Sequence, residues 1–425
     1  MTNFKKTTLK NGLRLITIPM QDTQTATVLV LVGTGSKYET KEINGLSHFL
    51  EHMFFKGTKK RPDTLAIAET LDRIGGEYNA FTSQECTGYW AKVKLDQLSL
   101  ALDWVSDIFL NSQLKQEEID RERGVILGEL NMYLDTPMSY VGDLWTDVLY
   151  GDQPAGWPVI GTKEVINSVN RQDFVNYLKS HYVNENTVIA VAGNIEEDKT
   201  IDLVEECFAQ APQGQAPQKP DVKINQTEPC QLIHYKDTDQ THIYLGVHGY
   251  SLQHPDRYPL GVLATILGGY MSSRLWIAVR EKEALGYYVK TGASPETDCG
   301  HLATRAGVDN NRVERAIEII LEHYQKIRDE KVDSNELEKA KENIKGSALL
   351  GMESSDEQAA FYASQEVLTQ KTLTLEEKLE KIDKVTVDDI QRVAQDVFQP
   401  SNLNLALIGP FKDEEKFAKQ IKSFL

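Results

Sequence analysis

The segment from residue 48 to residue 52 has the residue types and the spacing to hold a metal ion. His48 and His52 lie four residues apart, and Glu51 directly precedes the second histidine. No glycine or proline interrupts residues 46–55, so a helix is expected there, with the two imidazoles about 40° apart around it. Such a pair can fill two positions of a tetrahedral Zn²⁺ site. Glu51 lies on an adjoining face, within reach of a water on the metal, and this H-x-x-E-H order indicates hydrolytic chemistry.

Two histidines leave such a site incomplete, and the helical pattern at residues 116–134 offers the third ligand. Glu122 and Glu129 lie seven residues apart, on one helix face about 20° out of register. Glu129 follows an apolar run, so partial burial is expected, and a metal would give its carboxylate a partner. We predict Glu129 as the ligand and Glu122 as a residue that orients a ligating histidine or helps to bind the water. The alternative is two solvated glutamates on an acidic helix.

Composition places the chain among globular proteins. Its 425 residues are 40% hydrophobic and 26% charged, which excludes a disordered chain and suggests roughly two to three domains. The four cysteines are scattered and form no C-x-x-C pair. We therefore expect free thiols, which fit a reducing cytoplasm, and exclude a small disulfide-stapled fold.

The formal net charge is −17, and no block of lysine and arginine stands out. A nucleic-acid partner is therefore not expected. No run of about 18 apolar residues suggests a membrane-spanning helix. The first residues show neither a signal-peptide apolar run nor a small-residue cleavage site, so we predict a cytoplasmic protein with no membrane association.

The chain also shows a faint internal repeat. Residues 211–220 (APQGQAPQKP) have the composition of an exposed linker and divide the chain almost equally. A β-branched strand pattern at residues 25–36 reappears at residues 241–251, and each is followed by a helical pattern. Strands occur in clusters rather than alternating strictly with helices. We predict two homologous α+β domains, each a mainly antiparallel sheet flanked by helices, at residues 1–210 and 223–425, joined by a linker at 211–222.

The sequence resembles a known family, the inverzincin peptidases of the pitrilysin type (family M16). The resemblance spans nearly the whole chain, in the family's order, and is strongest to the short processing-peptidase branch found in mitochondria and bacteria. It rests on residues 48–58 around the histidine pair, and on residues 75–83, 122–129, 157–162, 267–275 and 280–282.

The resemblance implies a fold and a set of roles. Two homologous domains would form half of a clamshell, and only the first would carry Zn²⁺, one ion per chain. Chains of this length would pair into a homodimer, or into a heterodimer with a homologous chain. Peptide substrates would add a strand beside the edge strand that contains Asn79, Ala80, Phe81 and Thr82. Arg280 and Tyr287 from the second half would grip the substrate.

The sequence departs from the family pattern in two places. Gly128 stands where the family often has a first glutamate, which leaves Glu129 as the choice in that register. After Arg280 the usual Gly-Leu-Ala-Tyr run is altered to residues 284–288, ALGYY. By register Tyr287 matches the substrate-binding tyrosine, and Tyr288 is an alternative.

These observations lead to one predicted activity. We predict a zinc-dependent endopeptidase that cleaves unfolded or presequence-like peptides, with Glu51 as general base and Glu122 in support. Two alternatives remain: a non-catalytic or partner-dependent subunit of a two-chain peptidase, and a zinc-containing protein that binds peptides without cutting them. Two imidazoles and a carboxylate also accept other divalent metals.

Overall fold

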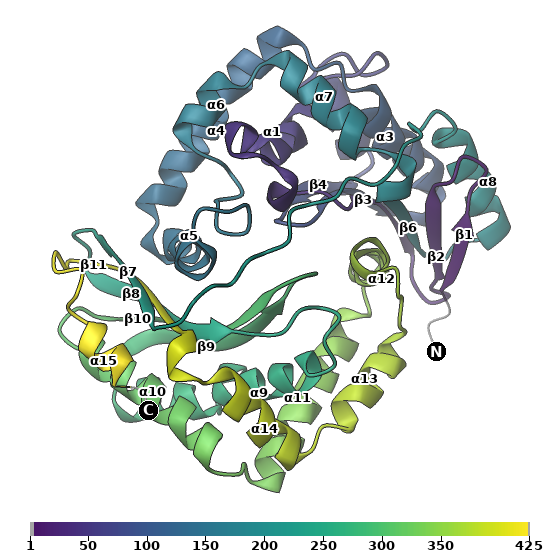
Figure 1. Cartoon of the computed structure of the whole chain (residues 1–425). Coiled ribbons are helices and arrows are strands. Elements are labelled where there is room, and N and C mark those ends of the chain that lie inside the picture. Colours follow the sequence, from purple (N-terminus) through teal and green to yellow (C-terminus); the bar gives the residue numbers. More distant parts are fainter. Residues whose placement is uncertain (1–3, 424–425) are drawn as a thin grey trace. The chain divides into compact units, whose positions relative to one another are not determined.

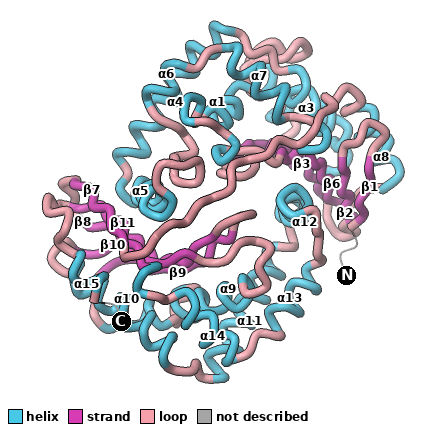
Figure 2. Tube along the Cα trace, viewed as in Figure 1, coloured by secondary structure: helices cyan, strands magenta, loops and turns pink. Residues whose placement is uncertain are grey.

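The computed structural model describes residues 4–423 and divides the chain into two compact units. The first unit contains residues 1–130, 158–220 and 348–376, and the second contains residues 131–157, 221–347 and 377–425. Helices and strands fill both units, and residues 211–229 form neither (Figures 1 and 2). Each unit is described by itself below.

A six-stranded sheet forms the centre of the first unit, in the order β1-β2-β6-β3-β5-β4. Only β2 and β6 pair in parallel, and the other neighbours are antiparallel. The elements of this unit are β1 (Lys5–Thr8), β2 (Arg14–Pro19), β3 (Thr25–Val32), α1 (Leu46–Met53), α2 (Thr64–Asp72), β4 (Glu77–Thr82), β5 (Thr87–Lys94), α3 (Leu98–Asn111), α4 (Gln116–Asp135), α6 (Lys163–Ser168), α7 (Arg171–His181), β6 (Thr187–Gly193), α8 (Glu197–Cys207) and α12 (Ser355–Thr369).

The central strands of this sheet are buried on both faces, and β3 shows why. Its eight residues are almost all apolar, and alternate side chains point to opposite faces. Val28 and Val30 pack in one core with side chains of α1, α3 and α7, whereas Leu29 and Leu31 pack in a second core with α12. A strand that is buried on both sides is expected to be largely apolar, as β3 and β6 are.

The second unit contains a five-stranded sheet in the order β7-β11-β8-β10-β9. Here β7 and β11 are the parallel pair. The elements are α5 (Pro137–Tyr150), β7 (Cys230–Tyr235), β8 (Gln240–His248), α9 (Arg257–Gly268), a π-helical segment (Trp276–Lys282), β9 (Gly286–Pro295), β10 (Gly300–Asp309), α10 (Val313–Asp329), α11 (Ser334–Gly351), α13 (Leu375–Asp383), α14 (Val387–Val397), β11 (Leu403–Gly409) and α15 (Ala418–Lys422). Helices α4, α11 and α13 each run across a boundary between the units.

The two sheets confirm the predicted fold class of two α+β units with mainly antiparallel sheets flanked by helices. The order β2-β6-β3-β5-β4 in the first unit matches β7-β11-β8-β10-β9 in the second, and the parallel pair occupies the same place in both. In the second unit, α9, α10 and α14 pack on one face of the sheet, and α5 packs on the other.

The compact units do not coincide with the two halves of the sequence, because one helix is exchanged in each direction. Helix α12 comes from the second half, yet Ala359, Tyr362 and Ala363 pack on the first sheet. Helix α5 comes from the first half, yet Val141 and Trp145 pack with residues of β10 and β11. The repeat in the sequence therefore marks two related sheets, while tertiary contacts assign the covering helices.

Two further observations concern composition. The four cysteines are free, as predicted. Among the described residues, no helix is long and apolar enough to cross a membrane.

Candidate metal centre

Helix α1 carries the histidine pair, and its first turn is held by a buried carboxylate. Gly45 precedes the helix with φ 97°, and a side chain on it would approach the Ile160 carbonyl oxygen to 2.5 Å. Glu39 is 2% exposed and accepts hydrogen bonds from the backbone N–H groups of Gly45 at 2.7 Å and Ser47 at 2.6 Å. A carboxylate suits the N-terminus of a helix, where N–H groups lack partners within the helix.

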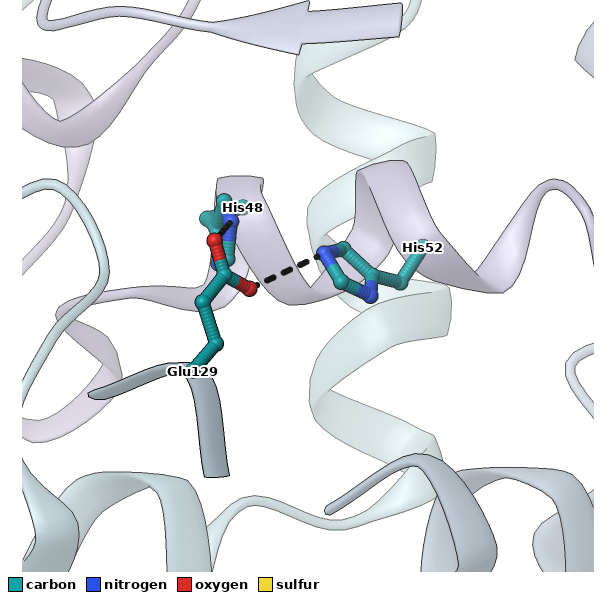
Figure 3. Close-up of side chains that lie close together, drawn as sticks. All are labelled: His48, His52 and Glu129. Carbon is teal, nitrogen blue, oxygen red and sulfur yellow. Dashed lines mark ion pairs between the residues drawn. The ribbon is translucent and has the colours of Figure 1, made fainter. Parts of the chain in front are cut away.

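The predicted ligands converge, as Figure 3 shows. The Nε2 atom of His48 lies 3.6 Å from Oε1 of Glu129, and Nε2 of His52 lies 3.5 Å from Oε2 of the same carboxylate. The ligand atoms of these three residues lie within 4.8 Å of one another. Helices α1 and α4 thus supply two imidazoles and one carboxylate, the set that was predicted.

Glu122 is the other predicted carboxylate on α4, and it contacts the opposite edge of His52. Its Oε1 lies 2.9 Å from His52 Nδ1, and its Oε2 lies 2.6 Å from the Lys56 ammonium. Burial alone would raise the pKa of Glu122, but the hydrogen bonds from His52 and Lys56 lower it below its ordinary value. The carboxylate is therefore ionised and accepts a hydrogen bond from Nδ1–H. In the neutral tautomer that donates from Nδ1 to Glu122, His52 presents the lone pair of Nε2 to Glu129.

The donor atoms fit a divalent cation. The lone pair of His52 Nε2 and the Glu129 carboxylate face each other at 3.5 Å, beyond ordinary hydrogen-bonding distance. Two electron-pair donors in this arrangement are stabilised by a cation between them, and His₂Glu is a ligand set of catalytic zinc. The neighbouring His48 imidazole lowers the pKa of Glu129 more than burial raises it, which keeps this carboxylate in the ligating form.

Glu51 joins α1, the helix of the two histidines, to the edge strand β4. Its side chain projects from α1 and accepts a hydrogen bond from the Thr82 hydroxyl at 2.6 Å. Thr82 is the last residue of β4, which pairs on one side with β5 and is the outer strand of its sheet. The predicted general base and the predicted substrate-binding strand are thus joined by a hydrogen bond.

The other predicted residues of β4 lie along this outer edge. Asn79 and Phe81 are exposed, while Ala80 and Thr82 are half-buried, so side chains alternate between the two faces of the strand. The strand pairs with β5 from Glu77 to Thr82 without a register shift. Backbone groups on the outer side of such a strand can pair with an added peptide.

Arg280 and Tyr287 lie in the second unit, where they line one cavity of about 520 Å³. The Arg280 guanidinium lies 4.4 Å from the centre of the Trp276 ring, and Tyr287 is 76% exposed. The Tyr288 hydroxyl instead lies 2.9 Å from Nδ1 of His242. Burial raises the pKa of Tyr288 to about 12. The geometry thus favours Tyr287 over Tyr288 as the residue available to a ligand beside Arg280.

Two residues that support this centre were not predicted. Lys56 pairs with Glu122 from beyond the end of α1, so helical spacing in the sequence did not predict this contact. No feature of the sequence indicated that Glu39 contacts the start of α1. Its role depends on a loop that places it beside the start of α1.

Comparison with known proteins places the chain in a family. The model described as Insulinase (Peptidase family M16) matches residues 14–163, and the model described as Peptidase M16 inactive domain matches residues 168–344. The chain belongs to peptidase family M16. Among the residues the structure describes, the one metal-ligand group lies within the first match, whereas the M16 inactive-domain match contains none.

Relatives of this M16 chain match it over nearly their whole length. An uncharacterised zinc protease of Bacillus subtilis is 38% identical over 410 residues, covering 96% of this chain and 98% of the relative. Another from Streptomyces coelicolor is 35% identical over 420 residues, covering 97% and 90%. The crystal structure of a protease from Helicobacter pylori is similar with a TM-score of 0.91 and 25% identity, covering 96% of this chain and all of that one. A peptidase M16 inactive domain from Pseudomonas fluorescens has the same fold, with a TM-score of 0.88 and 17% identity, covering 97% and 99%.

Proposed function

We propose that this M16 protein is a zinc-dependent endopeptidase that cleaves unfolded or presequence-like peptides. The observation that carries the proposal is the convergence of His48, His52 and Glu129, with Glu51 on the same helix. The names of its relatives support zinc and proteolysis. A peptide-binding protein without catalysis would not need Glu51 beside the ligands, and a closed structural site would take a fourth protein ligand.

The residues of the centre divide the work of peptide hydrolysis. His48, His52 and Glu129 would hold one Zn²⁺, which when bound supplies Lewis-acid polarisation of the scissile carbonyl and lowers the pKa of water. Glu51 takes the proton from the attacking water and returns it to the leaving amine. Glu122 accepts a hydrogen bond from Nδ1–H of His52 and so fixes which imidazole nitrogen is available for ligation.

Substrate recognition is proposed to use backbone groups. An extended peptide would pair with the outer edge of β4 beside Asn79, Ala80, Phe81 and Thr82, which requires little of the substrate's sequence. The hydrogen bond between Thr82 and Glu51 would bring the peptide backbone close to the general base. Arg280 and Tyr287 are proposed as further substrate contacts.

The decisive experiment measures cleavage of a quenched fluorescent peptide library before and after chelation, with zinc added back. The wild-type protein is expected to lose activity with chelator and to regain it with zinc. Glu51→Gln is expected to retain zinc and to lose turnover by at least about 100-fold, since general-base catalysis contributes factors of that order. Loss of zinc from this variant would contradict the role given to Glu51.

We also propose that the chain acts as a dimer, homodimeric or paired with a homologous chain. Light scattering of the purified protein tests the first form. A stable monomer that binds zinc and does not cleave would favour the partner-dependent subunit, and co-purification would then identify the missing chain.

A further inference from the structure

Two unpaired cations stand opposite each other on the second sheet. Lys290 of β9 and Arg305 of β10 are register partners, and both are exposed. Directly opposed residues of neighbouring strands project to the same face, where like charges destabilise the pair. Within residues 4–423, neither side chain forms an ion pair with a carboxylate. The fold therefore gains nothing from this pair of charges.

Two adjacent cations without a carboxylate partner contrast with the acidic character of this chain. Acidic residues outnumber basic ones, 63 to 46. Many surface lysines and arginines in the second unit pair with carboxylates, as Arg274 does with Glu336 and Arg392 with Asp256. Adjacent cations left unneutralised in an acidic protein create a local positive potential, which attracts anions.

The two cations also share a hollow rather than a flat surface. They line a cavity of about 230 Å³ together with Tyr244, Ser294 and His301. Trp145 of α5 packs 5.8 Å from the Tyr244 ring, so the covering helix reaches β8 and leaves Lys290 and Arg305 exposed. Gly292, two residues from Lys290 along β9, keeps the floor open, because a side chain there would meet nothing within 4 Å.

From this arrangement we infer that the cavity between Lys290 and Arg305 is a binding site for a carboxylate of a peptide. A guanidinium matches a carboxylate with two parallel N–H···O bonds, and an adjacent ammonium adds a point charge. The cavity is of a size for one acidic side chain or a chain terminus, with the polar residues Ser294 and Tyr244 in its lining. It is separate from the cavity of Arg280 and Tyr287. The inference rests on the proposed function only in taking a peptide as the ligand.

The test measures binding rather than turnover. Four fluorescently labelled peptides differ only in two features. Their internal acidic positions are either glutamate or glutamine, and their C-terminus is either free or amidated. Binding to full-length, zinc-loaded Glu51→Gln is followed by fluorescence anisotropy. A preference for the glutamate peptides assigns the site to side-chain carboxylates, and a preference for free C-termini assigns it to the terminal carboxylate. Equal binding of all four peptides would overturn the inference.

Three variants in the Glu51→Gln background locate the site. Lys290→Gln/Arg305→Gln is expected to weaken the preferred peptide about tenfold or more, and to abolish its advantage over the neutral peptide. Gly292→Leu keeps both charges and fills the cavity, so a similar loss is expected. Lys384→Gln removes an exposed cation elsewhere in the second unit and is the matched control.

The outcomes separate this inference from the proposed function. A loss in Lys384→Gln as large as in the paired variant would reduce the effect to net charge and overturn the site. Displacement of the peptide by inorganic phosphate at the peptide's own concentration would overturn the assignment to a carboxylate. Failure of the wild-type protein to cleave any peptide would contradict the proposed peptidase. It would not affect the binding preference, which is measured without turnover.

Discussion

At the scale of single residues, the metal centre is organised by where protons and charges lie. Glu122 is kept ionised by His52 and Lys56 and accepts a hydrogen bond from Nδ1–H of His52. The lone pair of Nε2 then faces Glu129, whose carboxylate is the one negative charge shared by both histidines. The two glutamates on α4 therefore make separate contacts: Glu129 lies beside the Nε2 atoms of both histidines, and Glu122 lies beside Nδ1 of His52.

Replacing Glu129 by Gln is expected to weaken zinc binding by more than about 100-fold. Loss of a residue that only contacts a ligand typically weakens metal affinity by about 10- to 100-fold, and loss of a ligand should cost more. The amide is neutral and a poor zinc ligand, while the helix and its packing are unchanged. Competition with a chromophoric chelator measures the affinity. Glu117→Gln, at an exposed position on the same helix, is the control. Unchanged zinc occupancy in Glu129→Gln would remove this residue from the ligand set.

At the scale of elements, the site depends on how α1 is held. The helix has eight residues, too few to be stable in isolation. Phe49 and Leu50 of α1 are buried in the core of the first unit. Glu39 accepts hydrogen bonds from backbone N–H groups at the N-terminal end of the helix. These contacts fix the rotation of the helix, and with it the direction of both imidazoles.

Replacing Glu39 by Gln is expected to lower both stability and zinc affinity. An amide offers one acceptor oxygen and two donors to N–H groups that need acceptors, and a buried unsatisfied group costs about 1–3 kcal/mol. Burial raises the pKa of Glu39, so its ionisation depends on these hydrogen bonds.

The control for that experiment is Glu366→Gln. Glu366 is a buried carboxylate on α12, paired with Lys6 at 2.6 Å and Arg14 at 3.3 Å. Its loss is expected to lower the thermal midpoint while leaving zinc affinity unchanged. Equal zinc affinity in both variants would limit Glu39 to a purely structural role.

Helix α5 covers two histidines that register opposite each other, His248 on β8 and His301 on β10. Burial lowers the pKa of each to about 4. The unfolded chain, with ordinary histidine pKa values near 6.5, binds more protons between pH 6.5 and pH 4. The stability that these two neutral histidines contribute is therefore fully present above pH 6.5 and is lost as the pH drops toward 4.

Thermal unfolding across this pH range measures the effect. His301→Phe is expected to reduce the loss of stability between pH 6.5 and pH 4, because one titrating group is gone, by an amount on the order of 2 kcal/mol. His254→Phe, at an exposed histidine in the same unit, is the control and should retain the full pH dependence.

At the scale of the whole molecule, the exchange of α5 and α12 ties the two halves of the chain together. Each half of the sequence contains a complete sheet but lacks the helix that covers one face of it. Without α12, the apolar side chains of Ile18, Leu29 and Leu31 would face solvent. Exposed apolar surface of this kind leads to association or misfolding.

Residues 1–222 and 223–425 expressed separately are therefore expected to aggregate or to bind the dye ANS. Expressed together, they are expected to associate and to recover the circular dichroism spectrum of the intact chain. Independent, monomeric folding of either half would contradict the exchange of helices.

The sequence by itself indicated the chemistry that we propose. His48, Glu51 and His52 are local, and their spacing on a short helix is enough to indicate a metal and a base. Glu129 was also readable, since two glutamates seven residues apart share a helix face. The repeat and the class of fold followed from strand patterns at residues 25–36 and 241–251, because alternation and apolar content are local properties.

Only the tertiary structure decided what depends on contacts between distant segments. The contacts of Glu39, the different surroundings of Tyr287 and Tyr288, and the opposed Lys290 and Arg305 all required strand register or loop placement. The exchange of α5 and α12 is the largest example. An amphipathic helix encodes which of its faces is buried, but not which sheet it covers, and that choice is made by the cores available to it when the whole chain folds.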